Sequence, residues 1–211
     1  MTWMDEASTP VHCVQLQEEF EWLLGIYDKL KPRKVLEIGA HVGGTLWHFM
    51  QHSPRGSNFT SVSIGSTAHI PLWVQWANEH GHGLEAIDAD STSLGSVDWM
   101  KIQAPYDFAF IDGSHWWEYV SQDWANVQPM MRQGGIVAFH DITEHGGMPD
   151  ECVDVPRLWK TIRNNKQLKT AEKVALPGVY CGIGVVFIGE EPDDEHPTDN
   201  RAPRRTNRAT R

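Results

Sequence analysis

Residues 34–45 read KVLEIGAHVGGT, and this stretch is the strongest indication of the fold. An apolar run that carries one acid, Glu37, leads into a loop with glycine at positions 39, 43 and 44. Such glycines let the backbone take positive φ and approach a ligand, while the N–H groups that open the next helix can hold a carboxylate or phosphate. A buried Glu37 would repel a dinucleotide pyrophosphate but suits a ligand with an amine and a positive charge. The stretch predicts a strand that ends on a small-molecule site, although a glycine loop alone is a weak signal.

Segments of strand length alternate with segments of helical periodicity on both sides of this stretch. The expected strands are residues 35–38, 59–64, 84–87, 106–111 and 136–139. The expected helices are a leading helix at about 14–30 and further helices at 45–51, 71–79, 93–101, 116–131 and 155–164, with Gly134-Gly135 stopping the fifth. This alternation predicts an α/β fold with a Rossmann-like, doubly wound and mostly parallel sheet.

The segment after residue 164 departs from the alternation. Two extended stretches, 169–176 and 179–188, flank Pro177-Gly178 and predict a hairpin. Because the strands of a hairpin pair antiparallel, we expect a sheet of about seven strands that finishes with a reversed C-terminal strand at one edge.

The length and charge of the chain limit the number of its domains and the kinds of partner that it can bind. The 211 residues, 40% of them apolar, suffice for one buried core, which we assign to residues 1–189. Residues 190–211 combine an acidic run with clustered arginines and are expected to be a disordered charged tail; a recruiting role for this tail is the less favoured alternative. The net charge of −10 argues against a nucleic-acid partner.

Cysteine usage and hydropathy bear on location. Cys13, Cys152 and Cys181 lack CxxC spacing, so neither a zinc site nor a disulfide framework is expected. The N-terminus lacks the pattern of a signal peptide, and no apolar run approaches the roughly 18 residues that a membrane span needs. We therefore expect a cytoplasmic protein without a membrane partner, and a homo-oligomer stays open.

Carboxylates are concentrated where the predicted strands end. Glycine and serine follow the second strand at Gly65-Ser66, and acids follow the third, fourth and fifth strands at residues 88–91, 112–115 and 140–141. In a doubly wound sheet the ligand lies beyond the carboxyl ends of the strands, so these residues should line one site.

Four motifs together resemble the class I S-adenosylmethionine (SAM)-dependent methyltransferases. They are ExGxxxGG from Glu37, the acid–serine pair Asp90-Ser91, FIDGSH ending at His115 and GGIVAFHD ending at Asp141. The sequence most resembles the metal-dependent O-methyltransferases, in the branch of cephalosporin-hydroxylase-like and macrolide-sugar methyltransferases. The resemblance covers residues 33 to about 141, and the terminal hairpin agrees with the reversed seventh strand of that family.

The resemblance implies a role for each cofactor-binding position. Glu37 would receive the amine of the cofactor's methionine moiety, and Asp90 and Ser91 would lie near its adenine. The full implied set is Glu37, Gly39, Ala40, Gly43, Gly44, Ser66, Asp90, Ser91 and Asp112. The family's acid after the second strand, which holds the ribose, is absent, because Gly65 stands at the matching place. Ser63, Ser66 or Thr67 would then face the ribose.

Asp112 and Asp141 end neighbouring predicted strands, so their carboxylates could converge on one divalent ion. Hard oxygen ligands favour magnesium, calcium or manganese, and we expect magnesium. His140 is a candidate third ligand, with a hydrogen-bonded core residue as the alternative, and helix capping is the alternative for the two aspartates. His115 is the candidate catalytic base, because imidazole titrates near neutral pH; a capping role is equally open.

The sequence thus predicts a SAM-dependent methyltransferase that acts on a hydroxyl of a small molecule, of sugar or natural-product type, with help from a divalent metal. Trp116 and Trp117 slightly favour a ring-shaped acceptor by stacking. A non-catalytic cofactor-binding module of the same fold is the alternative suggested by Gly65. A nicotinamide-dependent oxidoreductase is less favoured, because Glu37 and the terminal hairpin both count against it.

Overall fold

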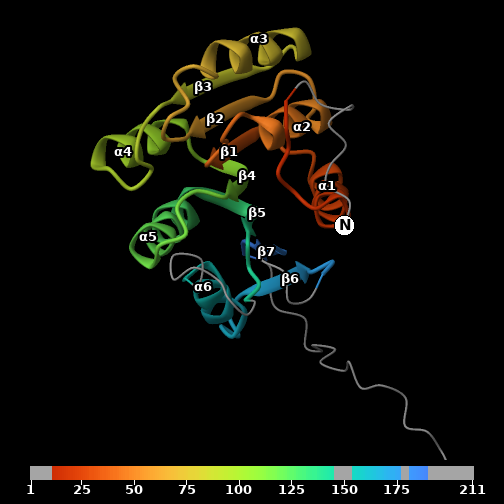
Figure 1. Cartoon of the computed structure of the whole chain (residues 1–211), viewed down its shortest axis with the longest axis vertical. Coiled ribbons are helices and arrows are strands. Elements are labelled where there is room, and N and C mark those ends of the chain that lie inside the picture. The colour runs from red at the N-terminus through yellow and green to blue at the C-terminus, as the bar shows by residue number, and fades with distance from the viewer. Residues whose placement is uncertain (1–10, 145–153, 177–180, 190–211) are drawn as a thin grey trace, which may run out of the picture.

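The computed structural model describes residues 11–144, 154–176 and 181–189. Its seven strands form one sheet in the order β3-β2-β1-β4-β5-β7-β6 (Figure 1). The strands are β1 (Lys34–Ile38), β2 (Asn58–Val62), β3 (Gly83–Ile87), β4 (Tyr106–Ile111), β5 (Met131–His140), β6 (Lys169–Lys173) and β7 (Ile183–Phe187). The helices are α1 (Gln17–Leu30), α2 (Gly44–His52), α3 (Ile70–His80), α4 (Leu94–Gln103), α5 (Trp117–Val127), the short 3-10 helix η2 (Gln128–Met130) and α6 (Asp154–Arg163).

The helices cover both faces of the sheet, as the predicted doubly wound fold requires. Figure 1 shows α1, α2 and α3 on one side and α4, α5 and α6 on the other. Successive residues of a strand point to opposite faces, so β4 gives Phe108 and Phe110 to the core under α1–α3, and Ala109 and Ile111 to the core under α4–α6. The predicted fold class is confirmed.

The parallel strands β1 to β5 bring their carboxyl ends to one edge of the sheet. β1 lies centrally between β2 and β4, with Ile38 opposite Val62 on one side and Ile111 on the other. The loops that follow β1, β2 and β4 therefore start at one level, and the site is built from them.

Several predicted boundaries are wrong, among them those of the second strand, the fifth helix and the fifth strand. The second strand ends at Val62 rather than at residue 64, so Ser63 is the first residue after it. The fifth helix ends at Val127, before Pro129, and Gly134-Gly135 lies inside the ten-residue strand β5 instead of stopping a helix. Gly134 has φ +73 and donates a hydrogen bond to Ile188, where β5 shifts its register against β4. A glycine pair in a strand marks such an irregularity as readily as it marks a helix end.

The C-terminal hairpin forms, but its reversed strand is not at the edge. β7 pairs antiparallel with both β5 and β6, so β7 lies second in the sheet and β6 is the edge strand. The buried β7 carries apolar residues at nearly every position, whereas β6 is the more polar segment KTAEK, which suits an edge.

The predicted hairpin turn at Pro177-Gly178, Cys152 and the predicted tail at 190–211 lie outside the described residues. Across the described ranges, no helix has the length and apolar character needed to cross a membrane.

Candidate functional site

A cavity of about 400 Å³ opens at the carboxyl edge of the sheet. The loops after β1, β2, β3 and β4 form it, together with the first turns of α5. Its lining residues are Ile38, Gly39, His41, Val62, Ser63, Ile64, Ala89, Asp90, Ser91, Asp112, Gly113, Ser114 and Tyr119. We call this space the main pocket. Its volume is within the range of small-molecule sites in proteins.

Four of the predicted cofactor residues line the main pocket: Gly39, Asp90, Ser91 and Asp112. One carboxylate oxygen of Asp90, Oδ1, accepts hydrogen bonds from the backbone N–H (2.8 Å) and the hydroxyl (2.7 Å) of Thr92. These two bonds fix the orientation of the Asp90 side chain at the wall of the pocket. A fixed acceptor at this point could bind an exocyclic amine of a purine.

In the loop after β2, one of the three residues expected at the ribose lines the main pocket and the other two do not. Ser63, only 6% exposed, is the residue that follows the strand and lines the main pocket. Gly65 instead donates its backbone N–H to Asp88 at 2.7 Å, and Asp88 also accepts from the N–H of Thr67. Ser66 is fully buried, donates its hydroxyl to the carbonyl of Ser63 and is not among the residues that line the pocket.

A second, much smaller cavity of about 40 Å³ lies between the glycine loop and residues 12–15. We call it the small cavity. Ala40 and Gly44 line it, as do Gly39 and Asp112, which also line the main pocket. Gly43 lines neither space. Asp112 therefore stands between the two cavities.

The glycines of the loop are required by packing within the chain. Gly39 has φ +91, and a Cβ on it would lie 2.0 Å from the backbone oxygen of Asp112. A Cβ on Gly43, which has φ +98, would lie 2.2 Å from the indole nitrogen of Trp73, and one on Gly44 would lie 2.5 Å from the carbonyl of His12. The absence of side chains thus lets β4, α3 and the N-terminal segment close on the loop.

Glu37 is fully buried on β1, behind the small cavity. Its Oε1 accepts a hydrogen bond from the hydroxyl of Thr45, a residue that lines this cavity. Its Oε2 has no hydrogen-bond partner among the described residues. Burial raises the pKa of Glu37 to about 8, and the nearby Asp112 adds to the rise against the lowering effect of Thr45. A cation placed beside Glu37 would favour its ionised form.

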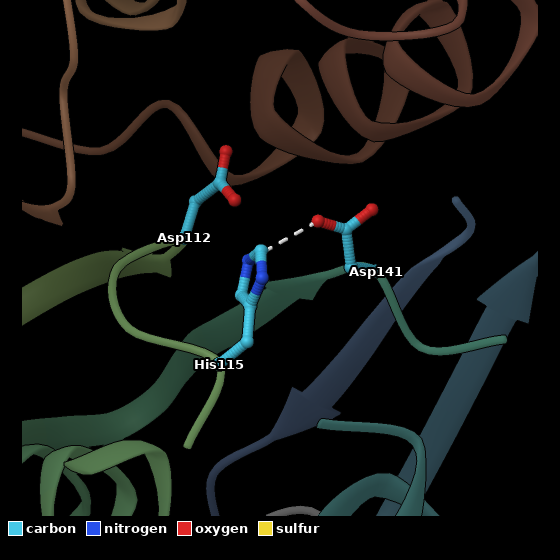
Figure 2. Close-up of side chains that lie close together, drawn as sticks. All are labelled: Asp112, His115 and Asp141. Carbon is cyan, nitrogen blue, oxygen red and sulfur yellow. Dashed lines mark ion pairs between the residues drawn. The ribbon is translucent and has the colours of Figure 1, made fainter. Parts of the chain in front are cut away.

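Asp112, His115 and Asp141 form a compact group at the ends of β4 and β5 (Figure 2). One potential ligand atom from each lies within 4.8 Å of the others. Nε2 of His115 is 3.3 Å from Oδ2 of Asp141, and the His115 side chain is 29% exposed. Asp141 adopts φ +60, an uncommon conformation for a residue with a side chain, and such conformations concentrate at functional sites.

His140 lies in direct contact with both aspartates. Its Nδ1 is 3.4 Å from Oδ1 of Asp112 and 3.2 Å from Oδ2 of Asp141. Burial acts to lower its pKa, but the two carboxylates outweigh burial and raise the pKa well above its usual value. A protonated His140 would hold the two acids together, and it is not in the group of three that could share an ion.

A further buried acid, Asp123 of α5, lies behind the wall of the main pocket and is 1% exposed. Burial raises its pKa to about 7; the nearby Ser91 side chain lowers the pKa and Asp90 raises it. Neither carboxylate oxygen has a partner at hydrogen-bonding geometry within the described chain. Asp123 does not line the main pocket, so it is not a candidate ligand-binding residue.

Sequence reasoning missed two polar side chains of the site, Gln15 and Tyr119, whereas Ser63 was one of the three residues expected at the ribose. Tyr119 lies on α5 and Gln15 precedes α1, and neither position carries a local signal. Of the two tryptophans expected to favour a ring-shaped acceptor, Trp116 is 47% exposed, whereas the Trp117 ring is covered by the guanidinium of Arg157, 4.1 Å from the ring centroid.

Comparison with known proteins identifies the class to which this arrangement belongs. The chain matches the family described as "Methyltransferase domain" over residues 36–142, just over half of its 211 residues. The chain belongs to this family, and the predicted resemblance to methyltransferases is confirmed. No curated protein matches the chain at a significant level.

Solved structures share its fold at low sequence identity. An O-methyltransferase from Bacillus cereus in complex with SAH is 16% identical with a TM-score of 0.65, covering 86% of this chain and 85% of that chain. The O-methyltransferase TomG from Streptomyces achromogenes, involved in tomaymycin synthesis and in complex with SAM, is 14% identical with a TM-score of 0.64 over 88% and 85%. A cofactor-bound protein from MTB is 16% identical with a TM-score of 0.69, again over 88% and 85%.

Proposed function

We propose that this protein is a SAM-dependent O-methyltransferase acting on a small molecule. The observation that carries the proposal is the position of Asp112, which lines the main pocket and the small cavity and also belongs to the polar group with His115 and Asp141. Asp112 thus lies at three places at once: the main pocket, which is large enough for a nucleoside, the small cavity, which could take a small cationic group, and the group of side chains that could accept a proton. Membership of the methyltransferase family agrees with this combination.

The two cavities fit the two ends of SAM. The adenosine part would occupy the main pocket, with Asp90 and Ser91 beside the adenine and Ser63 beside the ribose. The amino-acid part would extend past Asp112 towards the small cavity, where the buried Oε2 of Glu37 lacks a partner. An unpaired buried carboxylate oxygen is costly, and an ammonium group would satisfy it. The SAH-bound and SAM-bound structural neighbours support this choice of cofactor.

His115 is the base in this proposal. It is partly exposed, so an acceptor hydroxyl can reach it, and Asp141 lies 3.3 Å from its Nε2. Asp141 orients the imidazole and stabilises the imidazolium that forms when His115 takes the hydroxyl proton. When bound, the cofactor would supply an electrophilic methyl group, with SAH as the leaving group after the S–C bond breaks and the O–C bond forms. His115 would take the proton that the acceptor hydroxyl loses. The remaining task of the protein is to align the two reactants.

A divalent ion is a second candidate for the same group of residues. Asp112, His115 and Asp141 would hold it, and carboxylate oxygens favour magnesium over softer metals. His140, which we predicted as a ligand, would here hold the two aspartates from behind. Such an ion would lower the pKa of an acceptor hydroxyl.

Acceptor panels test the proposal directly. The purified protein is incubated with SAM and small hydroxylated compounds, sugars and phenols included, and release of S-adenosylhomocysteine (SAH) is measured. We expect release with at least one class, a loss of at least 100-fold in His115→Gln, and calorimetric binding of SAH but not of NADH. Binding of NADH alone would overturn the proposal in favour of an oxidoreductase, and tight SAH binding without turnover on any acceptor would favour a binding module.

A chelator separates the two roles for the polar group. If an ion takes part, EDTA removes activity and magnesium restores it, whereas activity that resists EDTA leaves His115 as the base without a metal. We further propose a cytoplasmic setting, because the buried Cys13 is a free thiol, as a reducing compartment maintains.

A further inference from the structure

The residues that precede α1 form a wall of the small cavity. Residues 11–16, which we call the strap, are held against the domain by Cys13 and Leu16, which are 2% and 3% exposed. The carbonyl of His12 lies so close to Gly44, at the start of α2, that a Cβ on Gly44 would be 2.5 Å from it. The strap is therefore packed on the first turn of α2.

Gln15 is the buried polar residue of the strap, with an exposure of 3%. Its Nε2 donates a hydrogen bond to Oδ2 of Asp112 at 2.9 Å, although the two residues are 97 positions apart in the sequence. Because Asp112 can only accept when ionised, the amide nitrogen must face it and the amide oxygen must face away. This oxygen, Oε1, is buried and has no partner in the part of the chain that the structure describes.

The small cavity thus has two unsatisfied acceptors associated with it, Oε1 of Gln15 and, behind Thr45, Oε2 of Glu37. The Gln15 amide oxygen needs a hydrogen-bond donor, and a cation beside Glu37 would favour the ionised form of this acid, in which Oε2 needs a donor as well. Its volume of about 40 Å³ is close to that of a single small polar group, since one water occupies about 30 Å³ in the liquid. A primary ammonium offers three donors and one positive charge, so it matches this chemistry.

We infer that Gln15 is a cofactor-binding residue whose amide nitrogen positions Asp112 while its amide oxygen accepts a hydrogen bond from the ammonium group of the methionine moiety. This inference rests on the proposed function. It assigns to the strap a part in recognising the amino-acid end of the cofactor, in addition to Glu37. A ligand that lacks the amino acid should gain nothing from Gln15.

The test compares two ligands on three proteins by calorimetry. SAH carries the ammonium group, and 5′-methylthioadenosine has the same nucleoside without the amino acid. Gln15→Met keeps the length of the side chain but removes both the donor and the acceptor. Gln17→Leu is the matched control, because the Gln17 amide pairs with Glu21 on the exposed side of α1. We expect Gln15→Met to bind SAH about 10- to 100-fold more weakly, as for a lost hydrogen bond to a charged group.

Methylthioadenosine affinity should stay within about twofold in Gln15→Met, and both affinities should do so in Gln17→Leu. Equal weakening of both ligands would reduce Gln15 to a packing role, and unchanged SAH affinity would mean that the cavity holds only water; either result overturns the inference alone. Failure of the wild-type protein to bind SAH would instead overturn the proposed function. Should Gln15→Met not fold, Gln15→Asn, which withdraws the amide by one carbon, is expected to show the same ligand selectivity.

Discussion

The two ends of the site are built on opposite principles. The main pocket is bounded by loop backbone and short side chains, such as Ser63, Ser91 and Gly113, and it leaves about 400 Å³ of space. The polar end, around Asp112 and Asp141, is crowded with ionisable groups that contact one another within about 3.5 Å. A change in the pocket should therefore alter shape and single contacts, whereas a change at the polar end should disturb several charges at once.

Gly39 lies where the two ends of the site meet, and its substitution should have the largest effect on stability. Gly39→Ala would place a methyl group 2.0 Å from the backbone oxygen of Asp112 at φ +91. We expect a loss of at least about 4 kcal/mol in the free energy of unfolding, measured by chemical denaturation, because the clash adds to backbone strain. Gly56→Ala is the control, since Gly56 has φ +84 with nothing within 4 Å of a Cβ, and should cost only about 1 kcal/mol. Equal losses in the free energy of unfolding of the two variants would show that the close approach of β1 and β4 is not the reason for glycine at position 39.

A substitution at the polar end should lower turnover without weakening nucleoside binding in the main pocket. Asp141→Asn removes the carboxylate beside both His115 and His140. We expect turnover with the best acceptor to fall about 100- to 1000-fold, as for the loss of an oriented base. Affinity for 5′-methylthioadenosine, measured by calorimetry, should change less than about threefold. A parallel loss of nucleoside affinity would contradict the separation of the two ends.

Asp123 behind the pocket should give stability an unusual pH dependence. Its pKa rises to about 7 in the folded protein, from about 4 in an unfolded chain, so the folded state binds the extra proton between these values. Its contribution to stability is fully present below pH 4 and is lost as pH rises towards 7. Between pH 5 and pH 8 we expect the wild type to lose about 2 to 3 kcal/mol more than Asp123→Asn, by denaturation at each pH.

Asp98→Asn is the control for that measurement, because the Asp98 side chain is 75% exposed. This variant should follow the pH dependence of the wild type. If Asp123→Asn also follows it, Asp123 is ionised in the folded protein at pH 5, and a partner for its carboxylate has to be sought.

The smallest effect is expected at Ser63, which stands directly after β2. Ser63→Asp would place a carboxylate where the ribose hydroxyls are proposed to lie, and we expect SAH to bind about three- to tenfold more tightly, as for one or two added hydrogen bonds. Ser63→Ala should weaken binding by less than about fivefold. Calorimetry on both variants decides the matter; a weaker complex with the aspartate would place the ribose elsewhere in the pocket.

Much of the fold was predictable because its signals are local. Strand β4 was predicted at its observed bounds, Tyr106–Ile111, since an apolar run between polar segments needs no distant information. The convergence of Asp112 and Asp141 was predictable as well, because parallel neighbouring strands end at one edge. The pairing of His115 with Asp141 was not, since the loop that carries His115 could have pointed it elsewhere.

The alternation of strands and helices, the glycine loop after β1 and the acids at the strand ends could be read along the chain. The packing that requires glycine in the loop, the residues that reach the site and the position of Gln15 could be seen only in the folded protein. Gln15 meets Asp112 across 97 positions, and no periodicity or spacing along the chain encodes such a contact. Local patterns follow from the geometry of one element, whereas contacts between elements depend on how all of them pack.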